Sequence, residues 1–254
     1  MSKRPTVLCF SGHDPSGGAG IQADIEAIKA QGCHALSVIT CLTRQDTHNI
    51  FNISPCSTET IKQHAQTLFE DIEIDAIKIG LIGEAKIALA LSEVLSEHPD
   101  VPVIFDPVLA AGGGYEFASE QLLDTIKSKL LPLTTVITPN TQETMRLTET
   151  SVWNNAAHIF SARGVKYTLI TGTHENATAV TNRLFNHNKL LTEHVWGRLP
   201  KTYHGSGCTL ASSLAANIAK GLSIEDAAYK AQDYTWQSLK NSFQISSGQA
   251  IPLR

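Results

Sequence analysis

Residues 6–24 of the chain read TVLCFSGHDPSGGAGIQAD. The first part, residues 6–11, is apolar and rich in β-branched side chains, which predicts a buried strand. A segment of helical period follows over residues 20–31, and the glycines between the two predict a tight strand-to-helix connection. Pairs of this kind recur along the chain. The pattern is typical of βαβ units, which build a parallel sheet with helices on both faces.

The remaining elements keep this rhythm as far as residue 172. Apolar runs predict further strands at residues 34–40, 74–82, 101–109, 135–139 and 167–172. Segments of helical period predict further helices at residues 59–70, 84–97, 119–130 and 153–163. The alternation of strand and helix therefore predicts an α/β fold.

The pattern changes after residue 172. Two runs at residues 179–185 and 190–196 flank the polar turn 186–189, which predicts an antiparallel hairpin. A helix at 208–220 should end at Gly221, and a helix at 225–241 should begin at Ser223, with Asp226 three residues on. No internal repeat or long linker interrupts the chain, so we predict one domain over residues 1–254.

Composition narrows the classes of protein. The chain has 254 residues, of which 42% are hydrophobic and 17% charged, and this is typical of a soluble globular protein. Its net charge is −4 and its basic residues are scattered, which argues against nucleic acid and anionic membranes as partners. The start of the chain lacks the pattern of a signal peptide, so we expect a cytoplasmic location. Five cysteines without a C-x-x-C spacing suggest neither a disulfide framework nor a zinc site.

The glycine-rich segment is the first candidate site. Gly17, Gly18 and Gly20 let the backbone approach a ligand closely, and ligands of open α/β sheets bind at the carboxyl ends of strands. Residues 18–23 also fit the dinucleotide fingerprint G-x-G-x-x-A. A dinucleotide site requires its first glycine directly after the strand and an acidic residue about 20 residues on, and both are missing here. A tight connection without a ligand is the remaining alternative.

The second candidate site is Gly205-Ser206-Gly207-Cys208, at the start of an alanine-rich helix. Free amides and the helix dipole at such a start can stabilise charge on a transferring phosphoryl group. The same field should lower the pKa of Cys208 and make its sulfur a proton acceptor or a polarising group. The alternative is that Cys208 is a small packing residue.

Polar residues at strand ends form the third candidate site. Asp106 ends an apolar strand and Asn140 follows another, so both should emerge on the carboxyl edge of the sheet. Mg²⁺ needs one or two carboxylates beside its waters, and Asp106 with Glu143 could supply them. Asp106 and Asn140 could instead be local caps, and for Asn140 alone this is the favoured interpretation. Lys78, inside an apolar run, is expected either to extend its ammonium group to solvent or to form a structural pair.

These segments together resemble the hydroxymethylpyrimidine/phosphomethylpyrimidine kinases of thiamine biosynthesis, a branch of the ribokinase-like superfamily. The resemblance spans residues 12–234. Its most specific parts are residues 14–24 and 204–210, and it is also carried by residues 45–47, 78–81, 106–108, 138–140 and Glu143. The fold implied is a three-layer sandwich, with a mostly parallel central sheet, helices on both faces and a small antiparallel hairpin.

The resemblance implies a role for each motif. Asp24 and Gln45 would hydrogen-bond the amino group and ring nitrogens of the pyrimidine, in a pocket lined by Gly12, Ala19 and Leu81. ATP would lie over the C-terminal half, near Asn140, Thr171 and Gly172. Mg²⁺ would lie near Asp106 and Glu143. Gly205, Ser206, Gly207 and Cys208 would surround the transferring phosphoryl group. A homodimer is also implied.

Three departures from the family pattern affect the second phosphorylation. Asp46 stands where Asn is common, and residues 111–114 and 171–174 lack the lysines usual there. Fewer cations weaken the binding of a phosphorylated substrate. Phosphorylation of the alcohol is therefore expected more firmly than that of the monophosphate. Two other functions stay open: a kinase of pyridoxal or pyridoxine, and a non-catalytic pyrimidine-binding regulatory protein.

Overall fold

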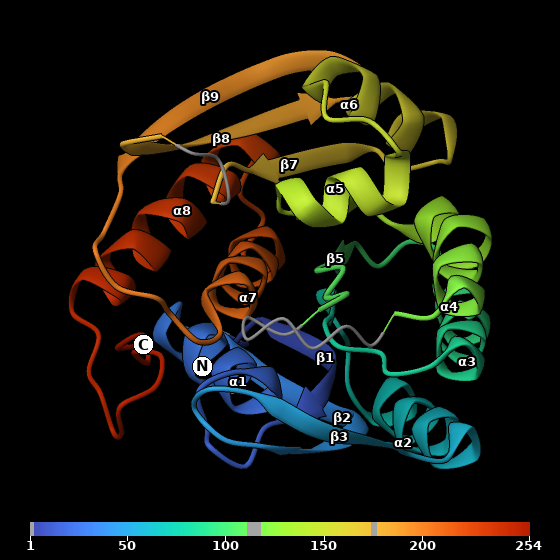
Figure 1. The fold of residues 1–254 in the computed structure, drawn as a ribbon. Coiled ribbons are helices and arrows are strands. Elements are labelled where there is room, and N and C mark those ends of the chain that lie inside the picture. The colour runs from blue at the N-terminus through green and yellow to red at the C-terminus, as the bar shows by residue number, and fades with distance from the viewer. Residues whose placement is uncertain (1–2, 111–117, 174–176) are drawn as a thin grey trace.

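A computed structural model describes residues 3–110, 118–173 and 177–254 of the chain. The described strands form one nine-stranded sheet in the order β3-β2-β1-β4-β5-β6-β7-β8-β9 (Figure 1). The parallel strands are β1 Thr6–His13, β2 His34–Gln45, β4 Ala76–Ile79, β5 Val103–Phe105, β6 Val136–Ile137 and β7 Tyr167–Thr171. The antiparallel strands lie at the two ends of the sheet and are β3 Ile50–Pro55, β8 Ala179–Asn186 and β9 Lys189–Gly197.

Strand β1 shows why the sheet has two covered faces. Its residues are buried from Thr6 to Gly12, and successive side chains belong to different hydrophobic clusters. Leu8 and Phe10 pack into one cluster, whereas Val7 and Cys9 pack into the other. Side chains alternate between the faces of a strand, so a continuous apolar run places hydrophobic residues on both.

The helices form the two outer layers (Figure 1). The first cluster contains residues of α2 Thr58–Asp71, α3 Ala85–Glu97, α4 Glu120–Thr125 and the turns η1 Ile126–Leu130 and η2 Leu131–Leu133. It also contains residues of α5 Thr141–Thr148 and α6 Trp153–Ala162. The second cluster contains residues of α1 Gly20–Ala30, α7 Ser206–Ala219 and α8 Ile224–Lys240. The predicted three-layer arrangement with a terminal hairpin is therefore confirmed. No described helix combines the length and the apolar character that crossing a membrane requires.

Two helix ends were predicted correctly from local sequence patterns. Ser223 accepts a hydrogen bond from the backbone N–H of Asp226 at the start of α8, as the sequence predicts. Gly221 has φ +80° directly after α7, so it ends that helix in the left-handed conformation that glycine tolerates.

Two elements were not predicted, and three strands were overestimated: β4 and β5 span four and three residues, of the nine predicted for each. Strand β2 continues to Gln45 and returns as β3, whose side chains are half-buried or exposed, so it lacks the apolar run of a core strand. Helix α5 has only eight residues, and most of them are polar. Strand β6 pairs over two residues instead of the five predicted, because the backbone beyond Ile137 turns into α5.

Candidate active site

The carboxyl ends of the parallel strands converge on the two glycine-rich segments. Strand β1 leads into residues 14–20 and then α1, and β4 leads to Gly80 and Leu81. Strand β5 is followed by Asp106, and β6 leads to Asn140. Helix α7 begins beside the same edge, since an added Cβ at Gly207 would lie 3.6 Å from both oxygens of Asp106. The fold therefore brings the three candidate sites together at the carboxyl edge of the sheet.

The first glycine-rich segment is wound around the side chain of Asp14. One carboxylate oxygen accepts hydrogen bonds from the N–H and the hydroxyl of Ser16, at 2.8 and 2.7 Å. The other accepts from the N–H of Ala19 and from Nε2 of His204, both at 2.8 Å. Burial raises the pKa of Asp14, but hydrogen bonds from His204, Gln45 and Ser16 outweigh it and hold the pKa below its ordinary value. Asp14 is therefore a charged centre that fixes the loop.

The two glycine-rich segments touch through their backbones. Gly205 has φ +75°, and an added Cβ there would lie 2.2 Å from the carbonyl oxygen of Gly18. A Cβ at Gly18 would lie 2.2 Å from the ring of His204. Only glycine at these positions permits so close an approach, and it places the start of α7 against the start of α1.

Four of the expected pocket residues lie around this contact. An added Cβ at Gly12 would lie 3.0 Å from Leu81, so these two residues are neighbours. The amide nitrogen of Gln45 lies 3.5 Å from Nε2 of His204. Ala19 is tied to Asp14 through its N–H. The structure thus gathers Gly12, Ala19, Gln45 and Leu81 beside the glycine-rich segments.

Asp24 differs from the expectation that it hydrogen-bonds a pyrimidine. Its side chain is fully buried and forms an ion pair of 2.8 Å with Lys78, which is also fully buried. Its oxygens also accept hydrogen bonds from Ser11 and Ser212. The physical reason is that a buried carboxylate requires a counter-charge, and Lys78 provides it. Lys78 thus forms a structural pair, which is one of the two outcomes expected for it. Burial lowers the pKa of Lys78, but Asp24, Cys208 and Asp106 raise it above its ordinary value.

Cys208 also differs from its prediction. Removal from water, with Asp106 and Asp24 nearby, raises the pKa of its thiol to about 12, although Lys78 acts in the opposite direction. Loss of hydration therefore outweighs the helix dipole that was expected to lower this pKa. The thiol is therefore protonated at neutral pH. It can donate a hydrogen bond, but it is no proton acceptor.

Asp106, which is buried, and Glu143, which is half-buried, are two carboxyl groups that interact electrostatically. Burial raises the pKa of Asp106 to about 6, and burial together with Asp106 raises the pKa of Glu143. Oδ2 of Asp106 has no hydrogen-bond partner among the described residues. The described residues contain no group of three or more His, Cys, Asp or Glu side chains arranged to hold a metal ion by themselves. Two carboxylates with an unpartnered oxygen fit Mg²⁺, which keeps waters and phosphate oxygens as its other ligands.

Asn140, Thr171 and Gly172 lie together at the next strand ends. Asn140 begins α5 through a capping box with Glu143, so the interpretation of Asn140 as a cap is confirmed. A parallel bridge joins Asn140 to Thr171. The N–H of Gly172 donates to the side chain of Asn182. Of the segments that lack lysines, residues 111–114 and His174 lie outside the described residues.

Asp46 uses one of its carboxylate oxygens in the local turn. Its Oδ1 accepts hydrogen bonds of 2.8 Å from the N–H groups of His48 and Asn49, which closes the turn between β2 and β3. Backbone hydrogen bonds from Asn49 and His48 lower the pKa of this carboxyl.

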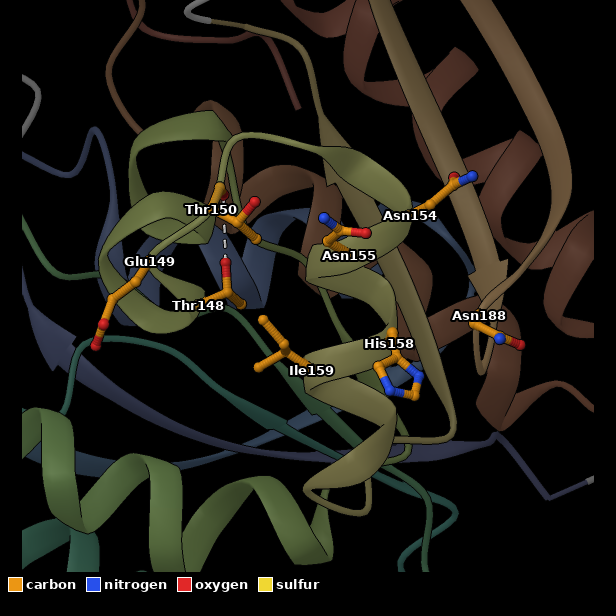
Figure 2. Close-up of a pocket in the computed structure, with 8 residues that line it drawn as sticks. All are labelled: Thr148, Glu149, Thr150, Asn154, Asn155, His158, Ile159 and Asn188. Atoms are coloured by element: carbon orange, nitrogen blue, oxygen red, sulfur yellow. Dashed lines mark hydrogen bonds between the residues drawn. The ribbon is translucent and has the colours of Figure 1, made fainter.

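A separate cavity of about 610 Å³ lies elsewhere on the molecule. Figure 2 shows its lining, with Thr148 and Glu149 at the end of α5, Asn154, Asn155 and His158 on α6, and Asn188 in the β8–β9 turn. None of the predicted site residues belongs to it.

Sequence reasoning gave no role to three residues that organise the site. Asp14 and His204 stand inside the quoted motifs, and the order Asp-Pro-Ser is a signal for the turn that Asp14 forms. Arg254 lies outside the recognised motifs. Its hydrogen-bond partners Gly18 and Thr209 are distant in the sequence, so no local pattern predicts these contacts.

The fold and the site define a class of protein. A mostly parallel sheet between helical layers, with a terminal hairpin and two facing glycine-rich segments, is a ribokinase-like kinase architecture. Two solved structures share it. Pyridoxal kinase of Bacillus subtilis, solved as an ADP complex, has a TM-score of 0.86 at 26% identity, over 98% of this chain and 97% of that one. Phosphomethylpyrimidine kinase of Clostridium difficile has a TM-score of 0.79 at 30% identity, over 92% and 98%.

The family follows from the sequence matches. Residues 14–253 match the model of the phosphomethylpyrimidine kinase family. The chain is 33% identical to the hydroxymethylpyrimidine/phosphomethylpyrimidine kinase of Streptomyces coelicolor, over 96% of this chain and 92% of that protein. The chain therefore belongs to the phosphomethylpyrimidine kinase family.

Proposed function

We propose that the chain is an ATP-dependent kinase of 4-amino-5-hydroxymethyl-2-methylpyrimidine, and that it also phosphorylates the monophosphate to the diphosphate. The observation that carries the proposal is the contact between the two glycine-rich segments, with Asp106 beside Gly207. This arrangement puts the amides of the α7 start directly beside the pocket residues. A kinase needs this juxtaposition, because a donor phosphate and an acceptor hydroxyl must meet in line.

Each group at the site has a chemical role in the proposal. The hydroxymethyl oxygen attacks the γ-phosphorus, the bond from that phosphorus to the β,γ-bridging oxygen breaks, ADP leaves, and the hydroxyl proton passes to solvent. The amides of Gly205 to Cys208 hydrogen-bond the equatorial oxygens during the transfer. Loss of one such donor typically costs about 3 kcal/mol of transition-state stabilisation. The protonated thiol of Cys208 adds a further donor, in keeping with its raised pKa. Gln45 supplies hydrogen bonds to the pyrimidine, and Gly12, Ala19 and Leu81 line its pocket.

Asp106 and Glu143 would hold Mg²⁺, which neutralises phosphate charge when bound. The raised pKa of both carboxyl groups supports this role, because a divalent cation is the charge that would favour their ionised forms. Asn140, Thr171 and Gly172 are proposed to contact the nucleotide. We also propose that residues 1–254 form one kinase domain, that the protein is cytoplasmic, and that it is a homodimer.

The experiment combines purified protein, Mg-ATP and hydroxymethylpyrimidine, and identifies products by mass. We expect ADP together with phosphorylated pyrimidine, and a Cys208→Ala variant with a kcat reduced by at least about 10-fold. Cys208→Ser, which keeps a hydrogen-bond donor, should retain more activity. Binding of the pyrimidine without ADP formation would indicate a regulatory protein instead. Full turnover by Cys208→Ala would remove this residue from the mechanism.

Pyridoxal is the second candidate substrate. It also carries a hydroxymethyl group on a flat nitrogen ring, and the similarity to the pyridoxal kinase of Bacillus subtilis favours testing it. Parallel assays with pyridoxal and hydroxymethylpyrimidine separate the two. A higher kcat/KM for pyridoxal would reverse the order of the candidates.

A further inference from the structure

Arg254 lies between the two glycine-rich segments and has no role in the proposal so far. Its side chain is fully buried, and all three of its donor nitrogens are used. Nη2 donates to the carbonyl oxygen of Gly18 at 2.6 Å, and Nε donates to the hydroxyl of Thr209 at 2.8 Å. Nη1 lies 3.2 Å from the carboxylate of Glu26, which is 41% exposed. One guanidinium therefore contacts the first segment, the start of α7 and α1.

These contacts fall at the point where the segments approach most closely. The carbonyl of Gly18 faces Gly205, where an added Cβ would lie 2.2 Å from that oxygen and 2.7 Å from Nη2 of Arg254. Thr209, the second acceptor, donates its hydroxyl to the carbonyl of Gly205 at 2.8 Å. Arg254 thus reaches Gly18 directly and Gly205 through Thr209. It fixes the spacing between the two backbones from both sides.

The backbone around Arg254 is anchored without the guanidinium. Leu253 donates its N–H to the carbonyl of Ser238 at 3.0 Å. Ala250 pairs with the strand-like segment at Thr202 and accepts a hydrogen bond from the N–H of His204. Gln249 donates to the carbonyl of Thr47, beside the Gln45 loop. A substitution at Arg254 therefore removes the guanidinium contacts and leaves the segment in place.

We propose that Arg254 is a positioning residue, which holds the two glycine-rich segments at the separation that phosphoryl transfer requires. The inference rests on the proposed kinase function. In-line transfer is sensitive to distance, since a displacement of about 1 Å can cost about 100-fold in rate. Without the guanidinium, the carbonyl of Gly18 and the hydroxyl of Thr209 lose their shared donor. The segments can then separate, while the pocket residues at Gln45 and Leu81 keep their places.

The test compares the kinetics of Arg254→Lys with those of wild type at a temperature where both are fully folded by circular dichroism. Lysine keeps the charge but cannot reach three acceptors with a planar fork. We expect kcat to fall by about 10- to 100-fold, with KM for the pyrimidine and for ATP changed by less than about 3-fold. Arg254→Ala should regain part of its kcat when methylguanidinium is added, because the ion replaces the missing group.

Two matched variants separate positioning from a general structural effect. Arg163, at the C-terminal end of α6, also donates to a backbone carbonyl, that of Leu147 on α5 at 2.8 Å. Arg163→Lys should therefore keep the wild-type kcat. Glu26→Gln should also keep it, because the contact with Glu26 is partly exposed. If Arg254 variants do not fold, Thr209→Val tests the same contact by removing the acceptor hydroxyl, and the same loss of kcat is expected.

The outcomes distinguish this inference from the proposed function. A wild-type protein with no turnover of any substrate would contradict the proposed function. A wild-type protein with normal turnover, and a folded Arg254→Lys or Thr209→Val variant with the same kcat, would overturn the positioning role. A rise in KM without a fall in kcat would also overturn it, because the residue would then act on substrate binding alone.

Discussion

At the scale of single residues, the buried charges of the site are fixed by many short contacts. Asp14 is 3% exposed and accepts four hydrogen bonds from Ser16, Ala19 and His204. These bonds favour the ionised carboxylate, which keeps the pKa of Asp14 below its ordinary value despite burial. A lowered pKa in the folded state means that the unfolded chain binds the proton more tightly. The contribution of Asp14 to stability must therefore depend on pH.

The sign of this dependence can be tested with Asp14→Asn. The contribution is complete above the unfolded pKa of about 3.9 and is lost as the pH falls toward the folded value. We expect the variant to lose about 2 kcal/mol of unfolding free energy at pH 7, since several hydrogen bonds to a charged group are weakened. The difference from wild type should shrink between pH 5 and pH 3. Urea unfolding at each pH measures it.

Asp46→Asn is the matched control for this prediction. Asp46 also accepts backbone hydrogen bonds, but its side chain is 53% exposed. Solvent screening should make its effect much smaller at every pH. A difference between wild type and Asp14→Asn that stays constant from pH 7 to pH 3 would contradict the assignment of the charge to Asp14.

The residues also show where sequence reasoning reaches its limit. The capping role of Asn140 was readable because the capping box is local, with Glu143 three residues away. The pKa of Cys208 was misjudged because a helix start is visible in the sequence, whereas the burial that raises this pKa is not. The partner of Asp24 was hidden for the same reason, since Lys78 lies 54 residues further along the chain.

At the scale of elements, the contact between the two glycine-rich segments combines backbone conformation with close approach. Gly205 begins α7 at φ +75° and lies against the carbonyl of Gly18. Gly221 follows the same helix at φ +80°, but an added Cβ there would meet nothing within 4 Å. Both positions need the left-handed conformation that glycine tolerates, but only Gly205 also needs the absence of a side chain. A comparison of Gly205 with Gly221 therefore separates these two effects.

Alanine at each position gives the prediction. Gly221→Ala should cost about 1–2 kcal/mol of unfolding free energy, the usual penalty for a left-handed residue with a Cβ. Gly205→Ala should cost about 1–3 kcal/mol more, because its Cβ also displaces the Gly18 carbonyl. It should also abolish turnover, whereas Gly221→Ala should not change kcat. Thermal or urea unfolding and the kinase assay provide both readouts. Equal stability losses would show that the close approach has no energetic effect.

The elements that sequence reasoning found are those with a strong apolar signal. β1 is buried along most of its length, and α7 carries an unbroken series of buried small residues, so both stand out. β3 and α5 were missed because their side chains are largely polar or exposed, and their positions depend on pairing and capping with distant segments. The candidate segments nevertheless lie together at the carboxyl edge of the sheet, because this edge follows from the order of the parallel strands.

At the scale of the whole molecule, one buried ion pair joins the sheet to the helices of one face. Lys78 on β4 contacts Asp24 on α1 and Ser11 on β1, while Ser212 on α7 donates to Asp24 at 2.7 Å. Both charged side chains are fully buried. Each charge is therefore compensated only by the other. The polar centre formed by Lys78, Asp24, Ser11 and Ser212 connects the four elements β4, α1, β1 and α7.

A double-mutant cycle on Lys78 and Asp24 tests this coupling. Lys78→Met leaves a buried carboxylate with two hydroxyl donors and no counter-charge, so we expect a loss of about 3–5 kcal/mol in unfolding free energy. Asp24→Asn should cost a similar amount, because it leaves the ammonium group uncompensated. The double variant removes both charges, so its loss should be well below the sum of the single losses. Urea unfolding of the four proteins gives the coupling energy directly.

Lys3→Met is the control, because the side chains of the Lys3–Glu73 pair are 51% and 79% exposed and the pair should contribute at most about 1 kcal/mol. Additive losses at Lys78 and Asp24 would mean that the two charges are independently solvated, and the polar centre would then not hold the four elements together.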